Sequence, residues 1–183
     1  NIDVGWWYIP IFIFIIGATA FSVNEIDGLD GLAGGTLLMA FGAYGAIAFA
    51  EGKFELAAFC GVIIGAITAF LWINIHPARF FMGDTGAMSL GATLGIVAML
   101  TNYALLLPII CLPMVLESLS VIIQITSKKL RNGKKVFKSA RLHHHLDAIG
   151  WEEPQIVMRF WMIAAVSAVI GVILALSDMQ LFK

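Results

Sequence analysis

Charged residues are scarce in this chain of 183 residues. Asp, Glu, Lys and Arg together make up 13% of the sequence, whereas 60% of it is hydrophobic. A soluble domain is typically about one quarter charged. The hydrophobic residues are spread along the whole chain rather than confined to one core segment. The composition therefore excludes an ordinary soluble domain and predicts a multi-pass membrane protein.

Cysteine is also scarce. The only two, Cys60 and Cys111, both lie inside apolar runs. A cysteine in such a position behaves as a small buried hydrophobic residue. The sequence therefore excludes a disulfide framework and a cysteine-based metal site.

Six segments are apolar enough to cross a membrane, which takes about 20 residues in a helix. They are residues 4–23, 32–50, 56–74, 87–101, 104–126 and 156–176. The fifth holds Pro108 and Pro113, which predict a kink or a frayed start. The predicted fold is all-α, a membrane helix bundle of about six transmembrane helices. We expect residues 1–183 to form a single integral-membrane domain.

Pairs of glycines recur at a spacing of four in two of these segments, at Gly61 and Gly65 and at Gly91 and Gly95. Small residues at this spacing let two membrane helices approach closely. Each pair therefore marks a possible helix–helix contact.

The basic residues predict the orientation in the membrane. Seven of the eleven lysines and arginines lie between the fifth and sixth segments. The positive-inside rule then places residues 24–31, 75–86 and 127–155 in the cytoplasm. The same cations could act as a topology signal, attract anionic lipid head groups or bind a phosphorylated substrate. The sequence leaves these three roles open.

The first polar segment, "NEIDGLDGLAGG", interrupts two apolar runs. Asn24, Asp27 and Asp30 are spaced three apart in it, which on a helix spreads them over an arc of about 120°. Carboxylates at a membrane edge are costly unless they are paired, solvated or bound to metal. A merely hydrated turn needs fewer polar residues, so the density of this pattern favours a functional role.

The second polar segment, "NIHPARFFMGDTGA", places Asp84 between two glycines and just before a predicted helix. An aspartate there suits Mg²⁺, which prefers oxygen ligands. Thr85 could cap the helix that follows. Phe80 and Phe81 could stack on a base, or they could anchor the chain at the membrane interface.

The third polar segment, "RLHHHLDAIGW", contains His143, His144 and His145. Consecutive residues on a helix point in different directions, so the three cannot bind one metal ion together. A neutral imidazole can act as a base near pH 7, and an imidazolium can bind phosphate. Glu117 is the one acid deep in a predicted span; it could be functional or could simply hydrogen-bond between helices.

All three polar segments are predicted on the same side of the membrane. Carboxylates, a predicted Mg²⁺ ligand, histidines, cations and aromatic rings would meet there. This combination suits phosphoryl transfer between a charged soluble substrate and a membrane lipid.

Three stretches carry a resemblance to a known family: "VNEIDGLDGLAGG", "FLWINIHPARFFMGDTGAMSLGATLG" and "ARLHHHLDAIGWEEPQIVMRFW". They resemble the C-terminal half of the phospho-N-acetylmuramoyl-pentapeptide transferases, in the polyprenyl-phosphate N-acetylhexosamine-1-phosphate transferase superfamily. The resemblance implies the last six helices of a ten-helix membrane enzyme. It implies transfer of phospho-N-acetylmuramoyl-pentapeptide from UDP-N-acetylmuramoyl-pentapeptide to undecaprenyl phosphate, giving lipid I and UMP with Mg²⁺ as cofactor.

The resemblance also implies roles for individual residues. Asp84 would be the metal ligand and, with Asp27 and the three histidines, would form the catalytic group. Asn24 would complete the polar floor beside Asp27. The uridine pocket would be lined by Gly28, Leu29, Asp30, Asn74 and Phe81, with Phe81 stacking on the base.

The family further implies a homodimer in the bacterial plasma membrane, surrounded by membrane lipid, with its active site facing the cytoplasm and no nucleic-acid partner. An adjacent aspartate pair and a lysine near the nucleotide, both typical of the family's N-terminal half, are absent from this sequence. We therefore expect the chain to be the C-terminal portion of the enzyme, and to have little activity alone.

Three other interpretations remain. A related transferase of UDP-N-acetylhexosamine to a polyprenyl phosphate would usually carry a different histidine pattern. A catalytically inactive fragment would share every motif. A membrane transporter would carry polar residues within its spans, whereas here they lie at the ends, with Glu117 the exception.

Overall fold

The computed structural model describes residues 5–131 and 133–181. Every regular element in this part of the chain is a helix, which confirms the all-α prediction. In chain order they are η1 (Gly5–Trp7), α1 (Tyr8–Ile26), α2 (Leu32–Ala50), α3 (Phe54–Asn74), α4 (Gly83–Leu100), η2 (Ala104–Leu106), α5 (Leu107–Ile110), α6 (Leu112–Leu130), α7 (Leu142–Ala148) and α8 (Glu153–Leu181). Val4, where the first predicted span begins, lies outside the described residues.

Five of these helices are long and apolar enough to span a membrane: α1 together with η1, α2, α3, α4 and α8. Helix α2 covers the predicted residues 32–50, and α3 ends where predicted, at Asn74. Helix α4 begins at Gly83 and α8 at Glu153, because both helices extend beyond their apolar stretch into polar residues.

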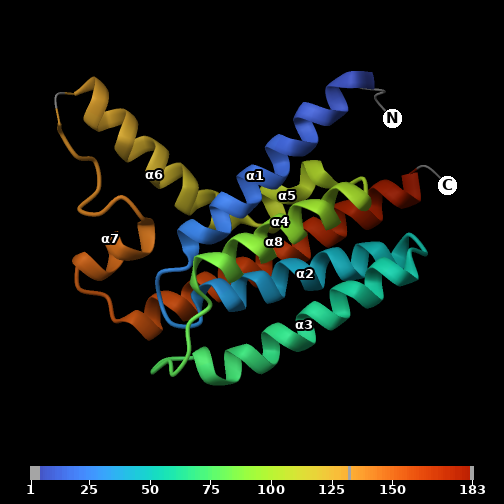
Figure 1. The fold of residues 1–183 in the computed structure, drawn as a ribbon, viewed down its shortest axis with the longest axis horizontal. Helices are drawn as coiled ribbons and strands as arrows, with labels where there is room; N and C mark the ends of the chain where they lie inside the picture. The colour runs from blue at the N-terminus through green and yellow to red at the C-terminus, as the bar shows by residue number, and fades with distance from the viewer. Residues whose placement is uncertain (1–4, 132, 182–183) are drawn as a thin grey trace.

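The fifth predicted span, 104–126, is broken, as its two prolines predicted. Residues Ala104–Ile110 and α6 meet at a bend of 83°. Pro113 lies in the first turn of α6, where a missing backbone N–H breaks no helical hydrogen bond. The prolines predicted a kink, and the structure makes it sharp enough to turn α6 away from the other long helices (Figure 1).

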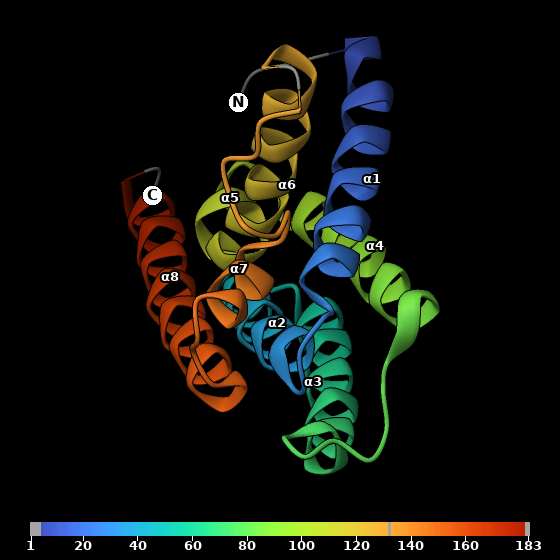
Figure 2. The same cartoon turned by 90° about the vertical axis from the view of Figure 1, so that its left-hand side faces the viewer.

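Helix α2 lies at the centre of the bundle, between α3 and α8 (Figure 1, Figure 2). Phe41, Tyr44 and Ile47 of this helix are fully buried. Because α2 is apolar all round, it can be covered on several sides at once. The polar turn that precedes it is thereby held against the ends of its neighbours.

Only one of the two glycine pairs is used in a helix contact. A Cβ on Gly91 would lie 2.7 Å from Ala20 Cα, and one on Gly95 would lie 3.2 Å from Ile16 Cα, so α4 packs directly on α1. Gly61 and Gly65 of α3 have no such neighbour within 4 Å in the described structure. The spacing marks a possible contact, but only the position of the partner helix decides whether it forms.

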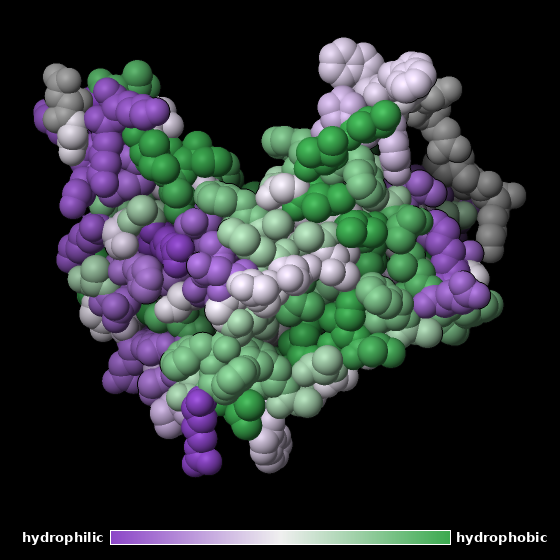
Figure 3. All heavy atoms as spheres, in the orientation of Figure 1, coloured by the Kyte–Doolittle hydropathy of each residue, from purple (hydrophilic) through white to green (hydrophobic). Residues whose placement is uncertain are grey.

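Hydrophilic side chains gather at the end of the molecule that carries α7 and the start of α8, whereas hydrophobic ones cover much of the sides (Figure 3). Exposed apolar residues on those sides include Val62 of α3 and Val166 of α8. This distribution fits a membrane protein with a polar region at one end. The segments around residues 24–31, 74–86 and 141–151 meet there, as the predicted topology requires.

Candidate functional site

The first polar segment is a turn between α1 and α2, not a continuation of the helix. Asn24 lies in the last turn of α1, Asp27 caps that helix, and the Gly28 N–H donates to the Ile26 carbonyl at 2.9 Å. Gly31 has a φ of 76° just before α2, a conformation that glycine adopts without steric cost. The spacing of Asn24, Asp27 and Asp30 is therefore not a helical arc, and residues 27–31 form a turn within the loop predicted at 24–31.

Asp27 faces several charged groups. Burial raises the pKa of its carboxyl above the ordinary value, and the negative charge of Asp84 raises that pKa further. The nearby Arg141 guanidinium, and to a lesser extent the His143 side chain, lower it. Residues from all three polar segments therefore interact around this one carboxylate.

Asp84 lies in the first turn of α4 and is exposed. A carboxylate in the first turn of a helix is favoured by the helix dipole. The expectation that Thr85 caps α4 is wrong, because the structure gives α4 no side-chain cap. The Asn24 Oδ1 is buried and has no hydrogen-bond partner in the described part of the chain. Within the described residues, the side-chain oxygens of Asp84 and Asp27 likewise accept no hydrogen bond.

Asn74 ties the first two polar segments together. Its Oδ1 accepts a hydrogen bond from the Gly31 N–H at 3.0 Å, and its Nδ2 donates to the Phe80 carbonyl at 2.8 Å. Trp161 of α8 donates from Nε1 to the Gly31 carbonyl at 3.1 Å. Asn74 therefore shapes the site through the backbone on both sides of it.

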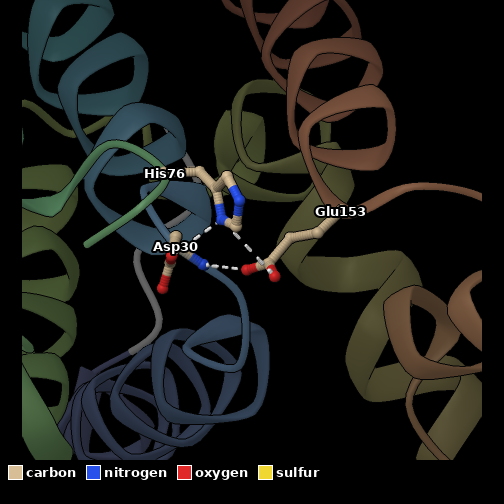
Figure 4. Close-up of side chains that lie close together, drawn as sticks. All are labelled: Asp30, His76 and Glu153. Atoms are coloured by element: carbon tan, nitrogen blue, oxygen red, sulfur yellow. Dashed lines mark hydrogen bonds and ion pairs between the residues drawn. The ribbon is translucent and has the colours of Figure 1, made fainter.

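Asp30 is held by residues from two other segments (Figure 4). Its Oδ2 lies 3.0 Å from His76 Nδ1 and accepts from the Ala78 N–H at 2.9 Å. Its own N–H donates to Glu153 Oε1 at 2.7 Å, and Glu153 Oε2 lies 3.7 Å from His76 Nδ1. These contacts join the turn after α1, the segment after α3 and the start of α8.

The three side chains of Asp30, His76 and Glu153 each bring one ligand atom to within 4.8 Å of the others, a spacing that could hold a metal ion. The backbone donors and the imidazole account for the position of both carboxylates without an ion. We therefore treat the cluster as a hydrogen-bonded support for Asp30.

The two neighbouring phenylalanines differ in their surroundings. Phe80 packs edge-on against Phe70 of α3, with ring centroids 6.2 Å apart. Phe81 has 66% of its surface exposed. Phe80 is also 58% exposed, so the two rings differ mainly in that Phe80 already has an aromatic partner.

The histidine triplet lies on α7, where its three members have different surroundings. His143 is fully buried, and its ring lies against Gly28. His145 Nδ1 accepts a hydrogen bond from the Lys138 N–H at 3.1 Å. His144 is half-buried; burial lowers its pKa, and the charges of His143 and Arg141 lower that pKa further. The predicted divergence holds for His145, whose ring packs edge-on against Phe137, but not for His143 and His144, whose ring centroids lie 4.3 Å apart.

Several residues of the site were not identified from the sequence. Arg141 donates from Nε to Glu25 Oε2 at 3.0 Å and so joins the start of α7 to the end of α1. His76 and Glu153 were missed, although both lie within the quoted motifs.

Glu117 is fully buried, and its carboxylate accepts hydrogen bonds from the α7 backbone. That use of Glu117 removes the one observation that favoured a transporter.

The fold and the site together define an integral-membrane helix bundle with a cluster of carboxylates, histidines and an arginine at one polar end. The model of Glycosyl transferase family 4 matches residues 1–102, more than half of the chain. The chain belongs to this family.

Curated proteins of one name match nearly the whole chain. The chain is 47% identical to the phospho-N-acetylmuramoyl-pentapeptide-transferase of Chloroflexus aurantiacus, over 96% of the chain and 50% of that protein. It is 44% identical to the proteins of the same name from Geobacillus thermodenitrificans and Halalkalibacterium halodurans, over 94% and 95% of the chain and 53% of each relative. The chain spans about half the length of the curated relatives it matches.

Proposed function

We propose that this chain forms the C-terminal part of a phospho-N-acetylmuramoyl-pentapeptide transferase. The reaction would transfer phospho-N-acetylmuramoyl-pentapeptide from the UDP-linked precursor to undecaprenyl phosphate, giving lipid I and UMP. The observation that carries the proposal is the meeting of Asp27, Asp84, Arg141 and the α7 histidines at one polar end. The names of the relatives, which match nearly the whole chain, support the choice of substrate.

Asp84, Asp27 and Asn24 would supply the oxygen ligands of a Mg²⁺ ion. Asp27 carries a carboxylate whose charge is disfavoured by burial and by Asp84, and Asn24 contributes a buried, unpartnered oxygen. A hard divalent cation prefers such oxygen ligands and would relieve the repulsion between the two acids. When bound, the ion would neutralise charge on the diphosphate. Asp84, the more exposed acid, is the proposed principal ligand.

The nucleotide would bind beside Asp30. Gly28 and Leu29 lie in the turn that carries this carboxylate, and Phe81 offers an exposed ring for stacking on the base. Asn74 would act by fixing the backbone at Gly31 and Phe80, since both ends of its amide are already bonded.

Among the three histidines, His144 is the best candidate for proton transfer or phosphate contact. His143 is buried against Gly28, and the Nδ1 of His145 is already bonded to the backbone. The lowered pKa of His144 favours a neutral ring near pH 7, as a general base requires.

We place the protein in the bacterial plasma membrane with this end facing the cytoplasm, because exposed lysines and arginines flank α7. Membrane lipid would surround the apolar sides, and a homodimer is proposed by analogy with the family. The family's aspartate pair is absent from this sequence, so we expect little turnover from the 183 residues alone.

The test uses the full product of the gene that encodes this chain, purified in detergent. With UDP-N-acetylmuramoyl-pentapeptide, undecaprenyl phosphate and Mg²⁺, it should release UMP, and chelation of the metal should stop the reaction. Asp84→Asn should lower kcat by about 10³-fold or more, as expected for loss of an essential charge. Glu55→Gln, an exposed carboxylate at the start of α3, is the matched control.

Full activity of Asp84→Asn would contradict the metal assignment. Release of UMP only when a different UDP-N-acetylhexosamine is supplied would favour the related sugar-1-phosphate transferase. Release with neither donor would contradict the transferase proposal.

A further inference from the structure

Helix α6 carries a polar stripe on its inner side. Glu117, Ser120, Gln124 and Ser127 follow one another at spacings of three and four, which places them on one face of a helix. All four side chains are less than 9% exposed. The outer side of the same helix exposes apolar residues such as Ile122 and Leu119. A buried polar stripe on a membrane helix is expensive unless every member is hydrogen-bonded.

Each member of the stripe bonds to the backbone of residues 134–143, as follows. Ser127 Oγ donates to the Lys134 carbonyl at 3.0 Å, and Ser120 Oγ donates to the Ala140 carbonyl at 2.9 Å. Gln124 accepts from the Val136 and Phe137 N–H groups, both at 3.0 Å, and donates to the Phe137 carbonyl at 2.9 Å. Glu117 accepts from the Leu142 N–H at 2.8 Å and the His143 N–H at 3.0 Å.

The segment that follows α6 runs antiparallel to that helix. As position falls from 127 to 117 on α6, the bonded backbone position rises from 134 to 143. The segment therefore runs back along α6 (Figure 2). Residues 134–141 form no helix or strand, so their backbone groups have no regular partners of their own. The side chains of α6 supply those partners, and we call this set of contacts the α6 ladder.

The last contact of the ladder positions the histidines. Arg141, the residue before α7, gives that helix no side-chain cap, and the carboxylate of Glu117 binds its first N–H groups instead. Glu117 Oε1 also lies 3.0 Å from His143 Nδ1, and both side chains are fully buried. Glu117 thus binds the first N–H groups of α7 and lies beside the His143 ring, which in turn lies against Gly28.

We propose that the α6 ladder is a positioning device that delivers the α7 histidines to the site, with Glu117 and Gln124 as positioning residues. The proposal rests on the proposed function for its effect on turnover. It accounts for the buried polar face of α6, on which the irregular residues 134–141 lie. It also assigns Glu117, which no part of the proposed chemistry uses.

The first test measures backbone hydrogen exchange in the full gene product. Gln124→Leu removes three hydrogen bonds while keeping a side chain of similar size. We expect peptides that cover residues 134–145 to exchange at least about tenfold faster, since ordering by several hydrogen bonds is lost. Thr126→Val removes a polar group from the exposed side of α6 and should leave the exchange unchanged. Unchanged exchange in Gln124→Leu would overturn the ladder.

The second test separates positioning from general stability. Gln124→Leu and Glu117→Gln should lower kcat for UMP release by roughly 10- to 100-fold, the scale of a misplaced catalytic group. The KM for the UDP-linked donor should change less than kcat, because none of the four ladder side chains contacts Asp30 and the ladder reaches the turn at Gly28 only through His143. Gln124→Glu keeps both acceptor contacts and should recover much of kcat.

An unchanged kcat alongside faster exchange would overturn the positioning role, and so would equal losses in kcat and donor affinity. If the unmutated protein releases no UMP, the proposed function fails. The exchange experiment would still decide whether α6 orders residues 134–145.

Discussion

The Cα of Gly28 lies against the imidazole of His143, so that a methyl group on Gly28 would overlap the ring nitrogen Nε2. The two residues come from the first and third polar segments, far apart in the chain. Because His143 is fully buried and its backbone N–H is bonded to Glu117, the ring has little room to move. The glycine of the Asp-Gly motif is therefore required by a histidine on another element.

Gly28→Ala should displace His143 and with it α7. We expect kcat for UMP release to fall by at least about tenfold and the thermal midpoint to fall, as is usual when a packed site is overfilled. Gly42→Ala on α2, where a Cβ would meet nothing within 4 Å, is the control. It should leave both kcat and the thermal midpoint unchanged.

A double mutant tests whether the effect passes through the histidine. In a His143→Ala background the added methyl group has no ring to meet, so Gly28→Ala should cost much less stability. Additive losses in the thermal midpoint would contradict a direct clash.

Asp30 should depend on His76 for its orientation. His76→Ala removes one of two partners of the Oδ2 atom and leaves the Ala78 N–H. Because His76 is partly exposed, the loss of stability should be below about 1 kcal/mol. The KM for the UDP-linked donor should rise by about three- to tenfold while kcat stays within about twofold. A fall in kcat with an unchanged KM would place His76 in the chemical step instead.

His144 should make stability depend on pH. Its folded pKa lies below the ordinary 6.5 because of burial, the largest cause, and the nearby charges of His143 and Arg141. Below pH 6.5 the unfolded chain therefore binds the proton more readily than the folded one. The free energy of unfolding should therefore fall as the pH falls from 6.5 toward the folded pKa of His144. Above pH 6.5 the contribution of His144 to stability should be complete.

The measurement is the thermal midpoint at pH 7.5 and 5.5. The difference between the two thermal midpoints should be smaller in His144→Gln, because glutamine cannot titrate. Arg141→Gln removes one cause of the lowered pKa and should also shrink it. An identical pH dependence in wild type and His144→Gln would refute the prediction.

Much of the helical arrangement was predictable. The apolar runs are long enough to predict each span, and α2 matches its prediction at both ends. The bend between α5 and α6 was indicated by two prolines, but its angle depends on what α6 packs against. The polar stripe on α6 looked like part of a span because its partners lie beyond it in the sequence.

The sequence by itself determined that this is an all-helical membrane protein, which three segments are polar, and which family their motifs resemble. These properties depend on composition and on residues near one another in the chain. Only the tertiary structure decided that Glu153 supports Asp30 across 123 residues, that Glu117 caps α7, and that His143 packs on Gly28. Such pairings depend on where helix ends meet in space, and no local pattern of residues records that.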